Sequence, residues 1–383
     1  MKKAESNDDT LCIRGMIGQV QPRPLSTFSR RIPGLLTLFA FVFALMGLLA
    51  GCNDDTVDLI AESKMTQLES EMRQLKNNTA LSMPGLPQLL TSGLQGASGS
   101  TIGPGGALYV TEGAVGRISR IDPETGAVTT FASGLPTSLI GIGGVYDVAF
   151  IGATAYALVT LVGSDIGGSD VVGIYRIDGP TSYTVIADIG AFAIANPPNT
   201  SFFVPTGVQY AIQTYRGAFL VTDGHHNRVL HVTTDGEITI FKTFGNSVPT
   251  GLAVSGNTIY MAEAGPVPHL PEDGRIVSFS PNSLAVSTIA TGARLLVDVE
   301  FNRGRTLFAL AQGLFTPGNP EGSPADPNTG SLVQVNAEGT FTVVADGLDQ
   351  PTSLEFIRNT AYIITLSGEV WTIENVASPP FGI

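Results

Sequence analysis

Short runs of alternating hydrophobic and polar residues fill the chain from about residue 88 onward, and Gly, Pro, Asn and Asp separate them. Runs of this kind that are rich in Val, Ile, Thr and aromatic residues predict β-strands joined by tight turns. One unit reads "PTGLAVSGNTIYMAEA" and then "GRIVSFSPNSLAVSTIATG". It predicts four strands: the first opens with Pro-Thr-Gly, the second is centred on an aromatic residue, the third opens with Gly-x-Ile, and the fourth ends in Gly.

This four-strand unit occurs six times. The six second strands are centred on Tyr109, Tyr156, Leu220, Tyr260, Phe308 and Tyr362. Successive centres lie 47, 64, 40, 48 and 54 residues apart. Four strands in about 40 to 50 residues is the period of a β-propeller blade. The expected fold class is therefore all-β, with a six-bladed β-propeller over residues 88–377.

The last copy is incomplete, because "GEVWTIENV" is followed only by a tail at residues 378–383. The missing fourth strand is predicted at the other end of the propeller. There "LLTSGL" at residues 89–94 resembles the blade-ending "TTFASGL" and "VVADGL". Residues 88–94 should complete the last blade and so remove the exposed edges of an open ring.

The segment before the propeller has a different pattern. Arg30 and Arg31 precede an uncharged apolar run that ends in "LAGC". A basic start, an apolar core and small residues at the end are typical of a secretory signal. The final four residues also resemble a bacterial lipobox. We therefore expect a lipoprotein signal peptide at 1–51 and a lipidated Cys52 that anchors an exported protein on the extracytoplasmic side of a membrane, in the periplasm or at the cell surface. The alternative is a plain transmembrane anchor.

Residues 52–87 read as a tether. Met65, Leu68 and Met72 recur at spacings of three and four, which predicts a short amphipathic spacer helix.

Charge and cysteine usage narrow the function classes. The net charge is −13 and the pI about 4.7, which disfavours nucleic acid and anionic membrane surfaces as partners. Cys12 lies in the expected leader, so the mature chain would have no thiol for a disulfide, a metal site or a nucleophile beside the lipidated Cys52.

Every long insertion falls in a connection from the second to the third strand or from the fourth to the next first strand. The insertions are 163–170, 189–203, 265–274 and 313–330. In a propeller these connections share one end of the ring, here named the top face. Long loops on a rigid scaffold usually bind something, although surface loops also tolerate insertions at little cost.

Two acidic residues are candidates for the central channel. Asp147 in "VYDVAF" and Asp298 in "LVDVEF" occupy equivalent places in blades two and five, which are opposite each other in a six-fold ring. They could hold a divalent cation, the candidate cofactor, or share a proton. The alternative is that each accepts hydrogen bonds from a neighbouring blade.

Other candidates belong to the top face. Glu112, Asp223 and Glu263 end second strands, where a solvated rim is the expected environment. His269 lies in the proline loop at 265–274 and is expected to be the most exposed candidate ligand. His225 and His226 lie in a turn, where a structural role and metal binding both remain open. Trp371 is expected in the core.

The phrases "GRISRIDPETGAVTTFASGLP" and "TDGHHNRVLHV" resemble NHL-type propellers, and residues 88–376 resemble the ScyD/ScyE group. The resemblance implies a fold but hardly a reaction. Related lactonases of the gluconolactonase type place Asn, Asp or Glu ligands for a divalent cation in the middle of Pro-Thr-Gly-like triplets. Here the middle residues are Thr206, Thr250 and Thr352, and a neutral hydroxyl is a poor ligand for such a cation.

The sequence therefore favours an exported, lipid-anchored propeller that binds a small molecule, a glycan or a protein at its top face, with no catalysis assigned. The alternatives are a sugar-lactone hydrolase or sugar dehydrogenase, and a scaffold of an envelope complex. The predicted partners are the membrane, through lipidated Cys52, and a top-face ligand. No G-x-S-x-G, H-E-x-x-H or P-loop motif is present.

Overall fold

The computed structural model describes residues 64–73, 84–303, 305–320 and 322–376. The chain divides into two units, Met1–Gln74 and Leu75–Ile383. The described part of the first unit is a helix at 64–73 that exposes Met65, Leu68 and Met72. Among the described residues no helix has the length and apolarity needed to span a membrane. The expected leader, Cys52 and the tail at 378–383 lie outside the described residues.

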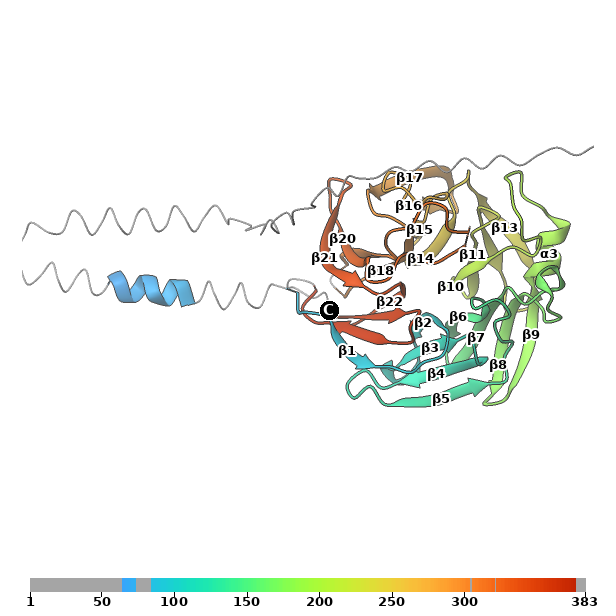
Figure 1. Cartoon of the computed structure of the whole chain (residues 1–383), viewed down its shortest axis with the longest axis horizontal. Coiled ribbons are helices and arrows are strands. Elements are labelled where there is room, and N and C mark those ends of the chain that lie inside the picture. The colour runs from blue at the N-terminus through green and yellow to red at the C-terminus, as the bar shows by residue number, and fades with distance from the viewer. Residues whose placement is uncertain (1–63, 74–83, 304, 321, 377–383) are drawn as a thin grey trace, which may run out of the picture. The chain divides into compact units, whose positions relative to one another are not determined.

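The second unit is an all-β, six-bladed propeller of six four-stranded antiparallel sheets (Figure 1). Blades one and two contain β2 (Ala97–Ile102), β3 (Leu108–Glu112), β4 (Arg117–Ile121), β5 (Val128–Ser133), β6 (Gly144–Ile151), β7 (Thr154–Thr160), β8 (Gly173–Gly179) and β9 (Ser182–Asp188). Blades three and four contain β10 (Gln209–Tyr215), β11 (Ala218–Asp223), β12 (Arg228–Val232), β13 (Ile238–Thr243), β14 (Pro249–Ser255), β15 (Thr258–Glu263), β16 (Arg275–Ser280) and β17 (Ser283–Thr291). Blades five and six contain β18 (Leu296–Phe301), β19 (Leu307–Ala311), β20 (Gly330–Val335), β21 (Phe341–Leu348), β22 (Pro351–Ile357), β23 (Thr360–Thr365), β24 (Val370–Ile373) and β1 (Gln88–Thr91).

The N-terminal strand closes the ring, as predicted. β1 pairs antiparallel with β24, with Leu89 opposite Trp371. The innermost strand of each blade lies beside those of both neighbouring blades, so the six inner strands surround one central channel (Figure 1). Closure leaves β24 paired on both sides instead of presenting an open edge.

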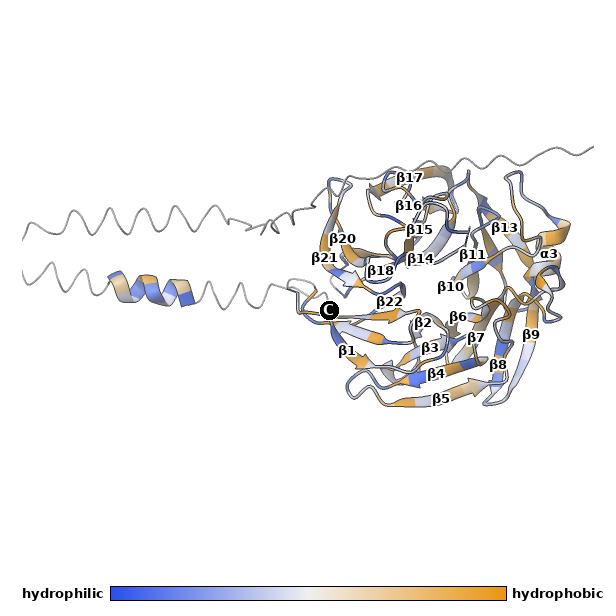
Figure 2. Ribbon diagram, in the orientation of Figure 1, coloured by the Kyte–Doolittle hydropathy of each residue, from blue (hydrophilic) through white to orange (hydrophobic). Residues whose placement is uncertain are grey.

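The hydrophobic core lies between the blades. Six clusters of buried side chains each join two adjacent blades. Between blades one and two, for example, the Tyr109 ring lies 5.0 Å from Phe131 and 4.7 Å from Phe150, centroid to centroid. Figure 2 shows hydrophobic and polar positions alternating along the strands. Since each buried large side chain stabilises the fold by about 1.5–3 kcal/mol, every blade depends on both its neighbours.

The top-face connections carry most of the structure outside the sheets. The connection from β9 to β10 contains the helix α3 (Ile189–Ala195), which Asp188 caps by accepting a hydrogen bond from the Ala191 amide at 2.8 Å. The connection from β7 to β8 contains the short 3₁₀ helix η2 (Ser164–Ile166). A further 3₁₀ turn, η1 (Pro104–Gly106), joins β2 to β3 at the opposite end of the ring.

Candidate functional site

The central channel holds a cavity of about 170 Å³, named here the channel cavity, which all six inner strands line. Asp147 on β6 and Asp298 on β18 both line it, as their equivalent places in blades two and five predict. Glu300 and Glu355 also line this cavity. Neither glutamate is among the channel residues predicted from the sequence, although each lies two residues beyond a channel-lining residue and so on the same face of its strand.

Asp147 and Asp298 accept equivalent main-chain hydrogen bonds, and Asp298 also accepts one from the Ser353 hydroxyl at 3.4 Å. Oδ1 of Asp147 accepts a hydrogen bond from the Val148 amide and Oδ2 accepts one from the Ile212 amide of blade three, both at 2.8 Å. Asp298 repeats this arrangement with the amides of Val299 and Leu354, the latter in blade six, again at 2.8 Å. Each carboxylate therefore joins two adjacent inner strands, which is the alternative that the sequence left open.

The preceding blade leaves room for each of these carboxylates by means of a glycine. A Cβ atom on Gly99 of blade one would collide with Oδ1 of Asp147, and one on Gly251 of blade four would collide with Oδ1 of Asp298. The contact therefore spans blades one to three and recurs in blades four to six. The propeller repeats this feature once every three blades.

Burial in the channel changes the acidity of these groups. Burial raises the pKa of Asp147 well above its usual value, and it raises the pKa of Asp298 to about 7 against the backbone hydrogen bonds from Leu354 and Val299. Burial also raises the pKa values of Glu300 and Glu355, and repulsion from the neighbouring carboxylates raises them further. At neutral pH the four groups therefore hold part of their protons.

The residues of the channel do not fit a divalent metal. Within the described part of the chain no three or more His, Cys, Asp or Glu side chains lie close enough together to hold one. The oxygens of Asp147 and Asp298 already accept main-chain amides. The hydroxyls of Thr206, Thr250 and Thr352 donate hydrogen bonds to protein atoms instead of facing a common centre.

Thr250 and Thr352 lie on inner strands, whereas Thr206 does not. The Thr250 hydroxyl donates to the carbonyls of Ala262 and Leu296, and that of Thr352 donates to Ile364. β10 begins only at Gln209, so the expectation that residues 205–207 open an inner strand is wrong. Thr206 lies in the preceding turn, where its amide and hydroxyl donate to Oδ2 of Asp165 at 3.0 and 2.8 Å.

The expected solvated rim of acidic residues is also wrong. Glu112, Asp223 and Glu263 are at most 2% exposed. Each pairs with the Arg directly opposite at the start of the third strand: Glu112 with Arg117, Asp223 with Arg228, and Glu263 with Arg275. The cross-strand position buries the carboxylate and supplies its counter-charge, so these acids stabilise their blades and line neither cavity.

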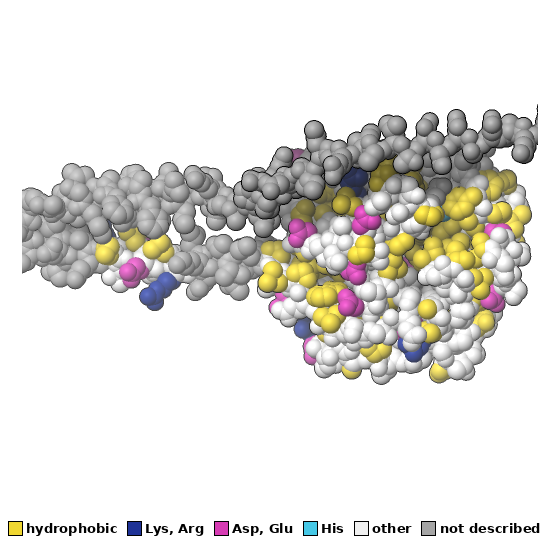
Figure 3. Space-filling model, in the orientation of Figure 1, with side chains coloured by type: hydrophobic (Ala, Val, Ile, Leu, Met, Phe, Trp, Pro, Cys, Tyr) yellow, Lys and Arg dark blue, Asp and Glu magenta, His cyan; other side chains and the backbone are white. Residues whose placement is uncertain are grey.

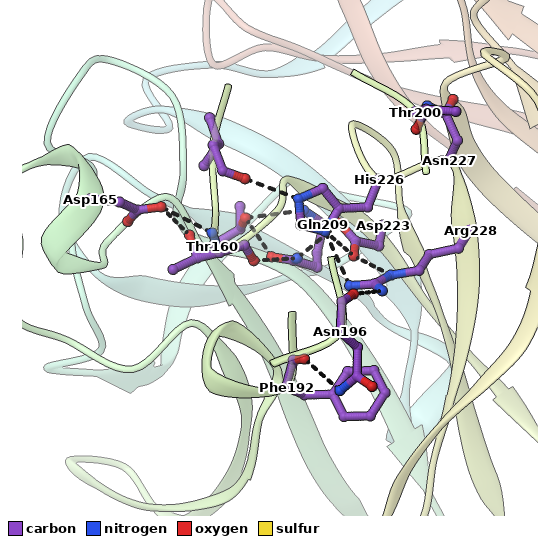
Figure 4. Close-up of polar contacts among 12 residues, drawn as sticks. Thr160, Asp165, Phe192, Asn196, Thr200, Gln209, Asp223, His226, Asn227 and Arg228 are labelled. Carbon is purple, nitrogen blue, oxygen red and sulfur yellow. Dashed lines mark hydrogen bonds and ion pairs between the residues drawn. The ribbon is translucent and has the colours of Figure 1, made fainter. Parts of the chain in front are cut away.

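The blade-three pair is the centre of a larger buried network (Figure 4). The Arg228 side chain is 1% exposed; it donates to Oδ2 of Asp223 at 2.8 Å and to the Asn196 carbonyl at 2.6 Å. His226 donates through Nε2 to the Val204 carbonyl at 3.1 Å, and its Nδ1 lies 3.1 Å from an Arg228 nitrogen and 3.2 Å from Oδ2 of Asp223. These bonds tie the 189–208 connection to blade three at two points, directly after α3 and near the start of β10, which supports a structural role for His226.

A larger cavity of about 370 Å³ lies above the channel, where the top-face connections converge. We name it the top-face pocket; its aromatic and imidazole lining consists of Tyr146, Phe202, Phe203, Tyr210, His225 and His269. Three of the four long insertions, at 189–203, 265–274 and 313–330, contribute to its wall, and the fourth, at 163–170, does not. Thr250 and Thr352 contribute from below.

The top-face pocket and the channel cavity share a wall. Tyr146, Tyr210, Val297 and Thr352 line both. The Tyr146 carbonyl accepts hydrogen bonds from the Ser98 and Thr111 hydroxyls of blade one, both at 2.7 Å, which fixes its backbone. The Tyr146 and Tyr210 rings lie 6.0 Å apart and nearly edge to face. Burial raises the pKa of Tyr146 to about 12, so its phenol stays protonated.

The two pocket histidines have different settings. Nε2 of His225 lies 3.2 Å from the Tyr210 hydroxyl, and burial lowers its pKa to about 4, which leaves the imidazole neutral at physiological pH. His269 is only 7% exposed, so the expectation of an exposed ligand is wrong. Its Nδ1 donates to the Ala264 carbonyl at 3.1 Å, and its ring lies edge to face against Phe315 at 5.3 Å.

The aromatic lining of the top-face pocket was not predicted from the sequence. Phe202 and Phe203 gave the clearest available signal, because two adjacent aromatic residues directly follow the polar and proline-containing stretch "NPPNTS". The Phe203 side chain is 56% exposed and its ring lies 4.8 Å from that of His225. Tyr146 and Tyr210 gave no such signal, since aromatic residues are common in strands.

No family model and no curated protein matches this sequence. Solved structures do match. A PQQ-bound aldose sugar dehydrogenase from Streptomyces coelicolor aligns with 76% of this chain and 97% of its own, at 12% identity and a TM-score of 0.53. A gluconolactonase from Xanthomonas campestris aligns with 75% of this chain and 89% of its own, at 12% identity and a TM-score of 0.53. A putative glucose dehydrogenase from Thermus thermophilus aligns with 75% of this chain and 98% of its own, at 16% identity and a TM-score of 0.52. The protein is therefore a six-bladed β-propeller whose structural neighbours include sugar dehydrogenases and a gluconolactonase.

Proposed function

We propose that this protein binds a small molecule in the top-face pocket. The observation that carries the proposal is the convergence of three long insertions and four aromatic side chains on one cavity of about 370 Å³. That volume lies in the range typical of ligand sites, and such sites are mostly apolar with a few polar groups. The Arg228 network supports the proposal, because it holds the connection that carries Phe202 and Phe203 in a defined position.

Binding of the neutral, solvatochromic dye Nile red tests this function. We expect saturable binding with one site per chain. Val267→Trp should abolish it, because Val267 lines the pocket at its rim and a larger side chain there would fill the entrance. Val343→Trp is the matched control, since Val343 is an exposed valine on the outer strand β21, away from the pocket. Unsaturable binding, or equal binding by both variants, would refute the proposal.

We further propose that the propeller is exported and anchored by lipid on Cys52, on the extracytoplasmic side of a membrane. The "LAGC" sequence after the apolar run supports this proposal. The finer assignment to the ScyD/ScyE group likewise stays a prediction from the repeat phrases. Mass spectrometry of the mature N-terminus tests the anchor: we expect an acylated Cys52, and any other N-terminal residue without an acyl mass would contradict it.

A second candidate function is an enzyme of the sugar-lactonase or sugar-dehydrogenase type. One observation favours it: the neutral His225 beside the Tyr210 hydroxyl in the pocket can accept a proton at physiological pH. Hydrolysis of glucono-1,5-lactone without added metal, lost in His225→Asn and retained in His231→Asn, would favour it. His231 lies on β12 and outside the pocket. A rate equal to that of uncatalysed hydrolysis would refute the enzyme function and leave binding as the only proposed function.

A further inference from the structure

The top-face pocket presents aromatic rings from several elements to one space. Tyr146 comes from β6, Tyr210 from β10, and Phe202 and Phe203 from the connection before β10. Phe203 lies against the His225 ring at 4.8 Å, and Tyr146 lies 6.0 Å from Tyr210. The face of an aromatic ring is electron-rich and attracts cations, most strongly where water is excluded. Ring lining of this kind suits an apolar group and equally an ammonium group.

No positively charged side chain offsets this character. Neither Lys nor Arg occurs among the described residues that line the top-face pocket or the channel cavity. His225 adds no positive charge at neutral pH, because burial lowers its pKa to about 4. Figure 3 shows few Lys and Arg side chains on the face of the propeller turned toward the viewer. The chain as a whole carries a net charge of −13.

The channel cavity lies directly beyond the shared wall of Tyr146, Tyr210, Val297 and Thr352. Its carboxylates need not touch a ligand to influence it. Because burial raises their pKa values, these groups are only partly ionised at neutral pH. The charge that they keep sets a negative potential that acts through a wall of low polarity, where screening by water is weak. This potential favours a cation in the pocket over a neutral molecule of the same shape, and a neutral molecule over an anion.

Apolar side chains are exposed at the pocket and elsewhere on the top face. Phe202, Phe203 and Val267 line the pocket and are at least 39% exposed. Ile194 is exposed on the connection that carries Phe202 and Phe203, and Leu139, Ile140 and Leu314 are exposed on other top-face connections. A ligand that extends beyond the pocket would therefore meet apolar surface. The two properties together select a molecule with an apolar body and a positive charge.

We propose that the top-face pocket takes an organic cation, a molecule in which an ammonium group is attached to an apolar ring or chain. The inference rests on the proposed binding function and adds the chemical class of the ligand. Aromatic rings hold both parts of such a molecule, and the charge distribution around the pocket ranks it above neutral and anionic analogues.

Three probes of one shape separate shape from charge: 1-naphthylmethylammonium, 1-naphthalenemethanol and 1-naphthoate. Their affinities for the full chain are measured by calorimetry at pH 7 in 20 mM and in 500 mM NaCl. At low salt we expect the ammonium probe to bind at least tenfold more tightly than the alcohol, and the carboxylate not to bind. At high salt the preference for the ammonium probe should shrink, because salt screens the potential.

Phe203→Leu tests the role of the rings, since leucine keeps an apolar side chain but removes the ring. Phe203 is 56% exposed, so the variant should fold. We expect it to weaken the ammonium probe several-fold and the alcohol less. Tyr183→Leu is the control: Tyr183 is 38% exposed on the outer strand β9 and lines neither cavity, so both affinities should stay unchanged.

The outcomes separate this inference from the proposed function. An alcohol that binds as tightly as the ammonium probe, or a carboxylate that binds most tightly, overturns the inference. The inference is also overturned if none of the three probes binds, while the wild type still binds Nile red and the Val267→Trp variant does not. If Nile red also fails to bind, the proposed function itself is refuted.

Discussion

The two cavities of the propeller share a wall but use their polar side chains differently. In the channel cavity, Asp147 and Asp298 each accept main-chain amides from two adjacent inner strands. In the top-face pocket the lining includes four aromatic rings and two imidazoles on connections and strands, beside aliphatic and neutral polar residues. The polar groups of the channel therefore hold the ring together, whereas the pocket presents surfaces suited to a ligand. Acidic residues in the centre of a propeller are thus no sign of a metal site by themselves.

The largest effect should come from the Arg228 network, because it stabilises blade three and also holds the connection that forms part of the pocket wall. Arg228→Met leaves Asp223 buried without its counter-charge and frees the Asn196 carbonyl, so we expect the free energy of unfolding to fall by about 3–5 kcal/mol. The 189–208 connection should loosen as well, and Nile red affinity should fall. Urea denaturation and dye titration measure the two effects. A stability loss with unchanged dye affinity would show that the pocket wall does not depend on this network.

Asp147→Ala should affect stability alone. It removes the acceptor of two buried amides, those of Val148 and Ile212, so we expect a net loss of about 2–4 kcal/mol. The folded fraction should bind Nile red as the wild type does. Asp346→Ala, at an exposed position on β21, is the control and should stay within about 0.5 kcal/mol. An Asp147→Ala variant with an unchanged free energy of unfolding would contradict the interpretation that Asp147 holds adjacent inner strands together.

The pH dependence of stability should reveal the raised pKa of Asp298. Its folded pKa of about 7 exceeds the usual value of 3.8, so the folded state binds more protons between these pH values. The contribution of this group to the free energy of unfolding therefore falls as pH rises from about 4 to 7 and is flat above that range. We expect the stability difference between pH 5 and pH 8 to shrink by about 2 kcal/mol in Asp298→Asn. Parallel profiles for wild type and variant would contradict the shift.

Calcium should have a smaller effect still. Because main-chain amides already occupy the oxygens of Asp147 and Asp298, 5 mM calcium should leave the melting temperatures of wild type and Asp298→Asn unchanged within about 1 °C. Melting curves against an EDTA reference measure this. A rise of several degrees in wild type that the variant loses would restore the channel as a cation site.

The smallest effect on stability is expected at the pocket rim. Phe203→Leu should change the free energy of unfolding by no more than about 0.5 kcal/mol, because the side chain is more than half exposed. Chemical denaturation measures it. A loss above about 2 kcal/mol would place Phe203 in the packing of the top-face connections and weaken the contrast between pocket and channel.

Local pattern alone predicted the parts of the fold that depend on neighbouring residues. The six strand centres, five aromatic residues and Leu220, all lie on second strands, and the strand near Leu89 pairs with that of Trp371. These predictions hold because alternation, turn residues and repeat length act within one blade, and the incomplete last copy required a partner. Equivalent positions in the repeat also predicted that Asp147 and Asp298 line one channel.

Only the tertiary structure decided what surrounds each side chain. The sequence by itself determined the ring and the face that carries its long loops. It did not reveal that His269 is packed against Phe315, that Glu112 is paired with Arg117, or that Tyr146 and His225 line one pocket. Burial and pairing depend on residues from other strands and other blades, brought together by ring closure. The physical reason is that strand periodicity is a local property, whereas a pocket is made by contacts between residues far apart in the chain.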